Sequence, residues 1–477
     1  MATYDSRWSA LKHYRDRTLK RLFNTSSFLG NVIIALVITY FLRFDDATPE
    51  MTYVLFLLIL SVGLWLTEAI PPFAVGIFVI AYLVLTLGSD YFLPEPMPVD
   101  RYVSTWTSNV IWLLLGGFFL ADAMKHVKLD RTLFRFTVRR FGTQPRRFLF
   151  GLMMMTALAS MVMSNTATTA MMITSILPLV NKLGKSSPVT KALLIGVPAA
   201  ASVGGLGTII GSTPNAIAVG ALDAVGIQIT FLTWMVFGIP LALVLVWAFW
   251  KFIGKELKNS APLDLAFLDD EPEYIVAQSE KRIVLFTLAL TVLLWSTESI
   301  HGIPLAGTSA VPIVILSLTR IISSDEVRAL PWDTLMLVAG GLALGRALVD
   351  VGLASAFIDG LKSMNLSLWV LAAIFGYLTL IMSNIMSNTA AASILIPISL
   401  GLEGIYQIAV PLIIAFAASC ALFLPISTPP NAIAYSTKLL EQKDFRRSGV
   451  FFAVVAPFFI FPLSFLASYL IGIGFAI

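Results

Sequence analysis

The sequence predicts an all-α, polytopic membrane protein that is built as an inverted repeat. Three observations predict this fold class. The 477 residues are 57% hydrophobic and only 13% charged, whereas a soluble protein of this length carries about twice that charge. Apolar stretches long enough to cross a bilayer follow one another along the chain, and four short motifs occur twice in the same order.

About 20 consecutive apolar residues cross a bilayer as one helix. Two apolar segments, 148–181 and 363–402, fit the alternation of sides only if each enters and leaves the membrane on the same side. We therefore predict that they are re-entrant helical hairpins, the first on the inner side and the second on the outer side. Eleven full spans are expected near residues 28–44, 51–70, 72–93, 107–125, 192–220, 230–253, 283–300, 303–320, 333–352, 409–437 and 449–474.

The basic residues orient this scheme. Residues 1–22 hold six Lys or Arg and no apolar core of a signal peptide, which predicts a cytoplasmic N-terminal arm. With that arm inside, the predicted cytoplasmic segments hold 28 of the 32 Lys and Arg, as the positive-inside rule requires. Turning either hairpin into a full crossing would invert every later segment and spoil this partition. The scheme predicts a multi-pass protein of the plasma (inner) membrane with its C-terminus outside.

Two charged segments divide the chain. Residues 126–147 place apolar among basic residues at roughly helical spacing, which predicts an interfacial helix, with a solvated basic loop as the alternative. Residues 257–281 hold two prolines and mixed charge between apolar blocks, which predicts a cytoplasmic linker. The predicted order is the arm, a first repeat over 23–256, the linker, and a second repeat over 282–477. Arg346 and Asp350, four apart on one predicted helix, are expected to form an ion pair.

Four repeated motifs indicate that the chain is a duplication. Their offsets drift slowly from 230 to 215 residues, which chance rarely produces. Because an odd number of predicted spans separates the two hairpins, the repeats are expected to be inverted, an architecture that secondary transporters use for alternating access. The pairs are "WLTEAI" (65–70) with "WSTESI" (295–300), Gly116-Gly117 with Gly340-Gly341, Ser164-Asn165-Thr166 with Ser387-Asn388-Thr389, and "STPNAIA" (212–218) with "STPPNAIA" (427–434).

The repeated polar motifs lie in uncharged apolar segments, where a polar side chain without a partner costs about 1–3 kcal/mol. The Ser-Asn-Thr triplets are predicted to mark the hairpin tips, because Ser and Asn cap helix N-termini. The Thr-Pro pairs are predicted to break the spans 192–220 and 409–437 at their middles, because proline is favoured at a first helical position. Such helix ends offer carbonyls to a cation and amide donors to an anion. The alternative is that these side chains only hold helices together.

No Lys, Arg, His, Asp or Glu falls in the four tip and break motifs. An anion bound there would lack a fixed counter-charge, and uncompensated charge at membrane depth costs at least ~2.5 kcal/mol. A mobile alkali cation, which suits neutral oxygen ligands, should therefore accompany the anion. The residues alone thus predict cation-coupled anion symport.

Other functional classes lack the chemistry that they need. The one cysteine, Cys420, excludes an internal disulfide and a cysteine metal cluster, and the three histidines lie far apart. The predicted centre holds amides and hydroxyls without an acid, base or activated nucleophile, so we expect no catalytic residue and no enzyme. A sodium/proton antiporter is a remoter alternative, because it would normally need a buried carboxylate at the broken helices. The predicted partners are small anions, cations and the lipid bilayer, with no nucleic acid.

The sequence closely resembles the divalent anion/sodium symporter family, whose bacterial dicarboxylate members are called INDY homologues. The features that carry this resemblance are the two Ser-Asn-Thr triplets on opposed hairpins and the two Thr-Pro breaks, which are paired across an inverted duplication. The resemblance covers essentially the whole chain after residue 22. It implies a homodimer with a scaffold domain and a mobile transport domain in each protomer, elevator-type motion, and uptake of a C4 dicarboxylate such as succinate with several sodium ions. Some relatives exchange dicarboxylates without sodium and others carry citrate or sulfate, so these activities stay open.

Carried over residue by residue, the resemblance implies at least two Na+ sites, one at each tip, and a substrate site between them. The extra Pro430 in the second break leaves two possible pairings of the breaks, one position apart. The first sodium site would use Ser160, Ser164, Asn165 and Gly211. The second would use Ser383, Asn388 and Ser427, with backbone carbonyls as the expected ligands. The substrate would be held by Asn165, Thr166, Ser212, Thr213, Asn388, Thr389, Thr428 and Pro429.

Overall fold

The computed structural model describes residues 23–43, 47–129, 132, 135–136, 140–264, 277–363 and 366–474, and this part of the chain is helical without strands. The predicted arm lies outside it, as do parts of the predicted interfacial helix and linker. Eight described helices are long and apolar enough to cross a membrane, and four shorter apolar helices accompany them. The chain is therefore a multi-pass membrane protein, as predicted. The count of eleven spans and the re-entrant course of the hairpins stay predictions.

The first predicted repeat contains the helices Phe23–Leu42, α2 (Pro49–Thr67), α3 (Pro72–Leu87), α4 (Asp100–Val103), η1 (Ser104–Thr107), α5 (Asn109–His126), α7 (Pro145–Ser160), α8 (Asn165–Leu183), α9 (Pro188–Gly204), η2 (Gly205–Gly207), α10 (Thr213–Ala224), α11 (Phe231–Ile253) and η3 (Gly254–Leu257). Proline opens α2, α3, α7 and α9. At this position proline's fixed φ suits the helix, and its missing N–H removes no intrahelical hydrogen bond.

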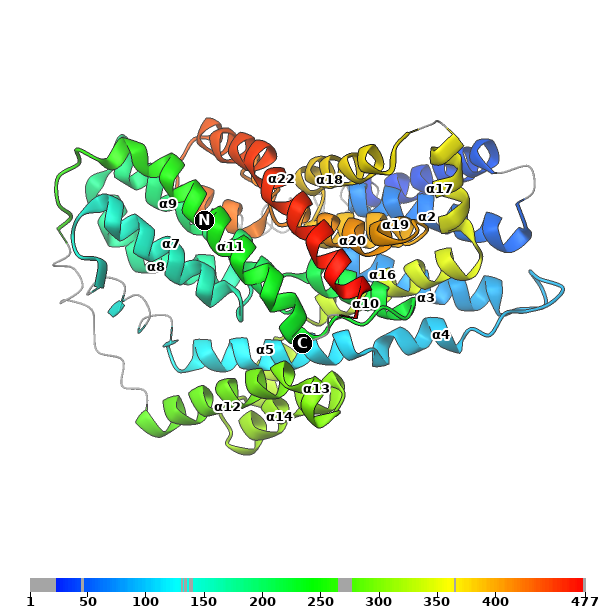
Figure 1. Ribbon diagram of the computed structural model, residues 1–477, viewed down its shortest axis with the longest axis horizontal. Helices are drawn as coiled ribbons and strands as arrows, with labels where there is room; N and C mark the ends of the chain where they lie inside the picture. The colour runs from blue at the N-terminus through cyan, green and yellow to red at the C-terminus, as the bar shows by residue number, and fades with distance from the viewer. Residues whose placement is uncertain are drawn as a thin grey trace, which may run out of the picture.

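The second predicted repeat contains α12 (Gln278–Ser296), α13 (Glu298–His301), α14 (Leu305–Leu318), α15 (Ser324–Arg328), α16 (Trp332–Asp350), α17 (Leu353–Ser363), α18 (Leu368–Ile385), α19 (Asn388–Ser399), α20 (Ile405–Ala418), α21 (Pro429–Ser436) and α22 (Gln442–Gly472). In Figure 1, α7, α8, α9 and α11 lie together at one end, whereas α12 and α14 pack against α5 along one side. Helix α16 packs closely on α3 and also contacts α19 and α10.

Both predicted tips begin a helix at the expected residue. Helix α8 starts at Asn165, where the Ser164 hydroxyl accepts a 3.1 Å hydrogen bond from Ala167 N–H. Helix α19 starts at Asn388, and the Ser387 hydroxyl accepts a 3.1 Å bond from Ala390 N–H. The same capping geometry therefore ends the turn between α7 and α8 and the turn between α18 and α19, as the repeated triplets predict.

Both predicted breaks are also present. Helix α9 ends at Gly204 and α10 begins at Thr213, while α20 ends at Ala418 and α21 begins at Pro429. The N-cap is Ser212 in the first break and Thr428 in the second, so the helix start shifts by one position relative to the motif. The extra proline in "STPPNAIA" accounts for this shift, because both prolines fit within the first turn of α21.

The repeated Gly-Gly pairs lie where helices approach one another closely. A Cβ on Gly116 would lie 2.9 Å from the Ser309 carbonyl oxygen of α14, and one on Gly340 would lie 2.2 Å from the Cα of Gly76 in α3. The second glycine of each pair faces another neighbour. A Cβ on Gly341, for example, would lie 2.5 Å from the Ser393 hydroxyl of α19. Each pair therefore lets one helix pack tightly between two neighbours.

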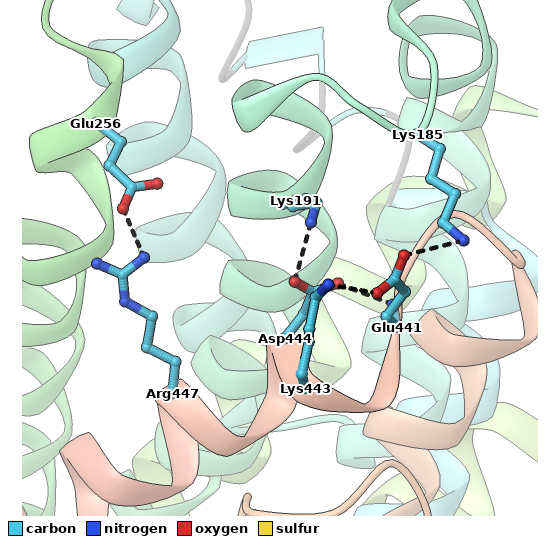
Figure 2. A network of polar contacts seen from close by, with 7 residues as sticks. All are labelled: Lys185, Lys191, Glu256, Glu441, Lys443, Asp444 and Arg447. Carbon is cyan, nitrogen blue, oxygen red and sulfur yellow. Dashed lines mark hydrogen bonds and ion pairs between the residues drawn. The ribbon is translucent and has the colours of Figure 1, made fainter.

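Ion pairs join the start of α22 to the first predicted repeat (Figure 2). Lys191 Nζ of α9 lies 3.1 Å from Asp444 Oδ1, and Lys185 Nζ lies 3.4 Å from Glu441 Oε1. Asp444 Oδ2 also accepts a 2.8 Å hydrogen bond from the Glu441 N–H, which completes a capping box at this helix end. The two halves of the chain are thus joined electrostatically at one end of the bundle.

The predicted pairing of Arg346 with Asp350 is wrong. Asp350 Oδ2 instead lies 3.1 Å from the guanidinium of Arg101, in the short helix α4. An ion pair between Arg346 and Asp350 would stabilise the helix only weakly, because an i,i+4 pair contributes about 0.2–0.5 kcal/mol. The tertiary contact between α4 and α16 brings Arg101 to the same carboxylate.

Candidate functional site

A cavity of about 400 Å³ lies where the two tips and the two breaks meet. The helices α5 and α16 complete its wall through Phe118 and Thr334, among others. Each tip contributes its Ser-Asn-Thr triplet, and each break contributes the residues before and at its Thr-Pro pair. Four polar motifs that are far apart in the sequence are therefore brought to one place.

The structure brings together all eight residues that were predicted to bind the substrate, since each of them lines the cavity. Five of the seven predicted sodium ligands also line it. The other two, Ser160 and Ser383, are fully buried in the last turns of α7 and α18, directly behind the tips. The predicted sets are thus neighbours in space.

At the first tip, oxygens converge on the side chain of Asn165. One end of its carboxamide lies 2.6 Å from Ser160 Oγ, 3.0 Å from the Ala201 carbonyl oxygen and 3.2 Å from the Gly211 carbonyl oxygen. With its nitrogen at this end, the amide donates hydrogen bonds to these oxygens. With its oxygen there, four oxygens converge, and neutral oxygen ligands of this kind suit an alkali ion. The Ala201 carbonyl is a member of this set that the sequence did not indicate.

At the second tip, side-chain atoms of two predicted ligand residues have no hydrogen-bond partner in the described part of the chain. These atoms are the hydroxyl oxygen of Ser383 and the side-chain oxygen of Asn388, both of which are buried. Leaving such atoms without a partner costs roughly 1–3 kcal/mol each. A cation that accepted their lone pairs would remove that cost.

Four helices begin at the cavity, two from each repeat. Helices α8, α10, α19 and α21 start at residues that line it. Each helix N-terminus carries free N–H groups and a partial positive charge of roughly half an elementary charge. No charged side chain is among the described residues that line the cavity. The arrangement can therefore bind an anion through backbone dipoles and hydroxyls alone.

Ser212, a predicted substrate ligand, is not free to turn in every direction. Its hydroxyl oxygen lies 2.9 Å from that of Ser419, just after the end of α20, and both residues are buried. The bond joins the first break to the second. Ser419 belongs to no repeated motif, so no signal in the sequence pointed to it.

Two asparagines that the sequence did not assign hold the breaks in shape. Asn215 Nδ2 donates to the carbonyl oxygens of Gly205 at 2.9 Å and Thr208 at 2.8 Å. Asn431 Nδ2 donates to the Leu424 carbonyl oxygen at 3.0 Å. The signal was present, because both are the asparagine of the repeated "NAIA".

Comparison with known proteins places the chain in a family. Residues 53–412 match the CitMHS family model, which is described as citrate transporter. The chain belongs to this transporter family. Its members are transporters, so the prediction that the chain is no enzyme is confirmed. The predicted resemblance to the divalent anion/sodium symporters is confirmed as well.

Within the described residues of this chain, no group of three or more His, Cys, Asp or Glu could hold a metal ion.

Curated relatives cover most of this CitMHS member. The sodium-dependent dicarboxylate transporter SdcS of Staphylococcus saprophyticus is 29% identical over 461 residues, which cover 88% of this chain and 86% of the relative. The SdcS protein of Staphylococcus aureus is 29% identical over 473 residues, which cover 90% and 89%. Both alignments run through the two predicted repeats.

Solved structures share the fold. The YdaH transporter of Alcanivorax borkumensis aligns with a TM-score of 0.54 at 15% identity, covering 84% of this CitMHS member and 98% of that chain. MtrF of Neisseria gonorrhoeae, described among antimetabolite efflux pumps, aligns with a TM-score of 0.52 at 12% identity, covering 86% and 96%. At these identities the likeness concerns the fold alone.

Proposed function

We propose that this transporter is a sodium-coupled symporter that carries a C4 dicarboxylate, such as succinate, into the cell. The uncharged cavity carries the proposal, because four helix N-termini meet there with the hydroxyls and amides of two Ser-Asn-Thr tips. Two equivalent donor sets suit a ligand with two carboxylates. The names of the staphylococcal relatives, which state sodium dependence and dicarboxylate transport, support the same substrate class.

Sodium ions would supply the missing counter-charge. A dicarboxylate brings two negative charges to a cavity wall whose described residues are all neutral. One Na+ at each tip would balance them and lower the cost of burying the anion. At the first tip, the hydroxyl oxygen of Ser160 and the carbonyl oxygens of Ala201 and Gly211 converge within 3.2 Å of the Asn165 carboxamide, which supports such a site. Ser164 would complete this first site. At the second tip, the unpaired oxygens of Ser383 and Asn388 support a site, and Ser427 would be its remaining ligand.

Alternating access would follow from the inverted repeats. In this proposal the tip and break helices, α7 to α11 and α18 to α22, move as one body against a scaffold that includes α3 and α14. The protein would work as a homodimer in the plasma membrane, with the N-terminus in the cytoplasm and the C-terminus outside. The ion pairs of Figure 2 support a single moving body, because they tie α22 to α9 and to η3.

Citrate is the second candidate substrate, because the matching family is described as citrate transporter. Citrate has a third carboxylate, which would require a further positive charge. The neutral wall is also compatible with sulfate as the substrate and with sodium-independent exchange.

The deciding experiment is uptake of radiolabelled succinate into proteoliposomes that contain the purified protein. An inward sodium gradient is compared with potassium and choline gradients at a set membrane potential. We expect accumulation with sodium only, stimulated by a negative interior if the sodium charge exceeds that of the dianion. Uptake that ignores sodium would indicate exchange. If labelled citrate or sulfate accumulates and succinate does not, the proposed substrate is wrong but the proposed binding site stands.

A further inference from the structure

The two repeats place corresponding residues beside each predicted sodium site. The tip motifs are offset by 223 residues, which pairs Ser160 with Ser383 and the next residue, Met161, with Asn384. The "STP" motifs are offset by 215 residues, which pairs Thr208 in the first break with Phe423 in the second. In each repeat the structure joins these two positions by a hydrogen bond between the tip and the break.

In the first repeat the side chain of the break residue makes the bond. The Thr208 hydroxyl donates to the carbonyl oxygen of Met161. The same hydroxyl oxygen accepts a 3.0 Å hydrogen bond from the N–H of Gly211, whose carbonyl is one of the oxygens around Asn165. Thr208 is only 3% exposed, so water does not compete for these bonds.

In the second repeat the side chain of the tip residue makes the bond. The Oδ1 of Asn384 accepts a 2.9 Å hydrogen bond from the N–H of Phe423. The Nδ2 of Asn384 donates to the Leu380 carbonyl oxygen at 2.7 Å, which fixes the amide against its own helix. The partners are the same two positions as in the first repeat, but side chain and backbone have exchanged roles.

We propose that Thr208 and Asn384 are positioning residues, each of which holds one tip against its break so that the oxygens of one sodium site stay in place. The inference rests on the proposed function, because it assumes that the two tips bind sodium. The Thr208 bond ties the first tip to the segment 208–212, and the Asn384 bond ties the second tip to the segment 419–428. Both segments lie between helices. Without the bond, sodium binding would itself have to order the loop, and its apparent affinity would fall.

The first test measures sodium binding without transport. Thr208→Val removes the hydroxyl at similar size, whereas Thr208→Ser keeps it. Purified protein without substrate is heated over a range of sodium concentrations, with potassium at matched ionic strength as the control. We expect Thr208→Val to require about tenfold more sodium for half of the stabilisation, as expected for loss of about one buried hydrogen bond. Thr208→Ser should behave like the natural protein.

The second test uses the exchange of roles. Asn384→Met gives the second tip the residue of the first and removes the acceptor for the Phe423 N–H, so sodium stabilisation should again weaken by about tenfold. The double variant Asn384→Met/Phe423→Thr supplies the hydroxyl that the first repeat uses, and it should recover most of the loss. The single variant Phe423→Thr is the reference, because it leaves the bond to Asn384 intact and should respond like the natural protein.

The outcomes separate the two proposals. If sodium stabilises the natural protein no more than potassium does, the proposal of sodium coupling is wrong, and this inference is wrong with it. If the natural protein responds but folded Thr208→Val and Asn384→Met respond identically to it, the positioning role is wrong while sodium coupling stands. If Thr208→Val does not fold, the Asn384 variants decide in the same way.

Discussion

Ser212 and Ser419, whose hydroxyl oxygens lie 2.9 Å apart, hydrogen-bond the first broken helix to the second at the cavity. The two residues are 207 positions apart and come from different predicted repeats. Ser212 lines the cavity, whereas Ser419 lies behind it and is fully buried. The direction in which the Ser212 hydroxyl points is therefore set by a residue from the other half of the chain.

Ser419→Ala should weaken substrate binding although Ser419 does not line the cavity. The change removes the partner of Ser212 and costs about 0.5–1.5 kcal/mol, or roughly a 2- to 12-fold rise in KM for uptake. Ser212→Ala should have an effect at least as large, because it removes the same bond and also a predicted substrate ligand. The double variant should be no worse than the poorer single variant, because both changes remove one bond. If the two effects add fully, the serines act independently.

Asn165→Ala and Asn388→Ala should each reduce uptake to the level of empty liposomes while leaving the protein folded. Each amide starts a helix at the cavity and carries an oxygen that we assign to a sodium site. Uptake is compared with that of Asn109→Ala, in which an asparagine outside the cavity loses a single 3.4 Å bond to Ala306 N–H. Full transport by either tip variant would remove that residue from the site.

Local chemistry made part of this fold predictable. Ser164 and Ser387 cap helices where the triplets predicted, and proline near the start of α10 and α21 marked the breaks. These features depend on residues within one turn of each other, so the sequence carries them directly. The convergence of the motifs in one cavity could be predicted only through the repeat.

Contacts between distant residues could not be predicted in this way. Asp350 pairs with Arg101 instead of its helical neighbour, because packing of α4 on α16 decides which cation is near. Ser419 and Asn384 belong to no repeated motif, yet both hold the breaks in position through hydrogen bonds to residues 207 and 39 positions away. Periodicity and motif spacing contain no information on such pairs.

Gly340→Ala should destabilise the protein. The added methyl would lie 2.2 Å from the Cα of Gly76, so α3 and α16 must move apart. Overpacking of this kind costs about 1–3 kcal/mol, which lowers the apparent melting temperature of the detergent-purified protein. The matched control is Gly360→Ala in α17, where nothing lies within 4 Å and alanine is the better helix former. Equal melting temperatures for Gly340→Ala and the natural protein would contradict the close contact.

Lys191→Met should destabilise the protein by about 1–3 kcal/mol. The change leaves the Asp444 carboxylate without its cation, and the Asp444 side chain is only 11% exposed. The free-energy cost of the change therefore lies between that of breaking a surface ion pair and that of breaking a buried one. Arg328→Met provides the control, because Arg328 and Asp325 form an ion pair whose side chains are 76% and 89% exposed. That change should leave the melting temperature unaltered. Equal melting temperatures for Lys191→Met and Arg328→Met would contradict the prediction.

Acidification should weaken the junction of Figure 2 through Glu441. Hydrogen bonds from Lys443 and then Lys185 hold the pKa of the Glu441 carboxyl below its usual value of 4.5. Because the pKa is lower in the folded protein, the stabilisation is complete above the unfolded-state value and is lost as the pH falls through the folded-state value.

Glu441→Gln removes this charge while keeping a side-chain acceptor for the start of α22. Melting temperatures are measured from about pH 6 to about pH 3 at low salt and at roughly 1 M salt. The natural protein should exceed the variant near neutral pH, and the difference should shrink toward zero as the pH falls. High salt should also reduce the difference in melting temperature, because the Glu441 carboxylate is exposed and salt screens its attraction to Lys185 and Lys443. A difference that does not change with pH would show that the side chain acts through packing and not through its charge.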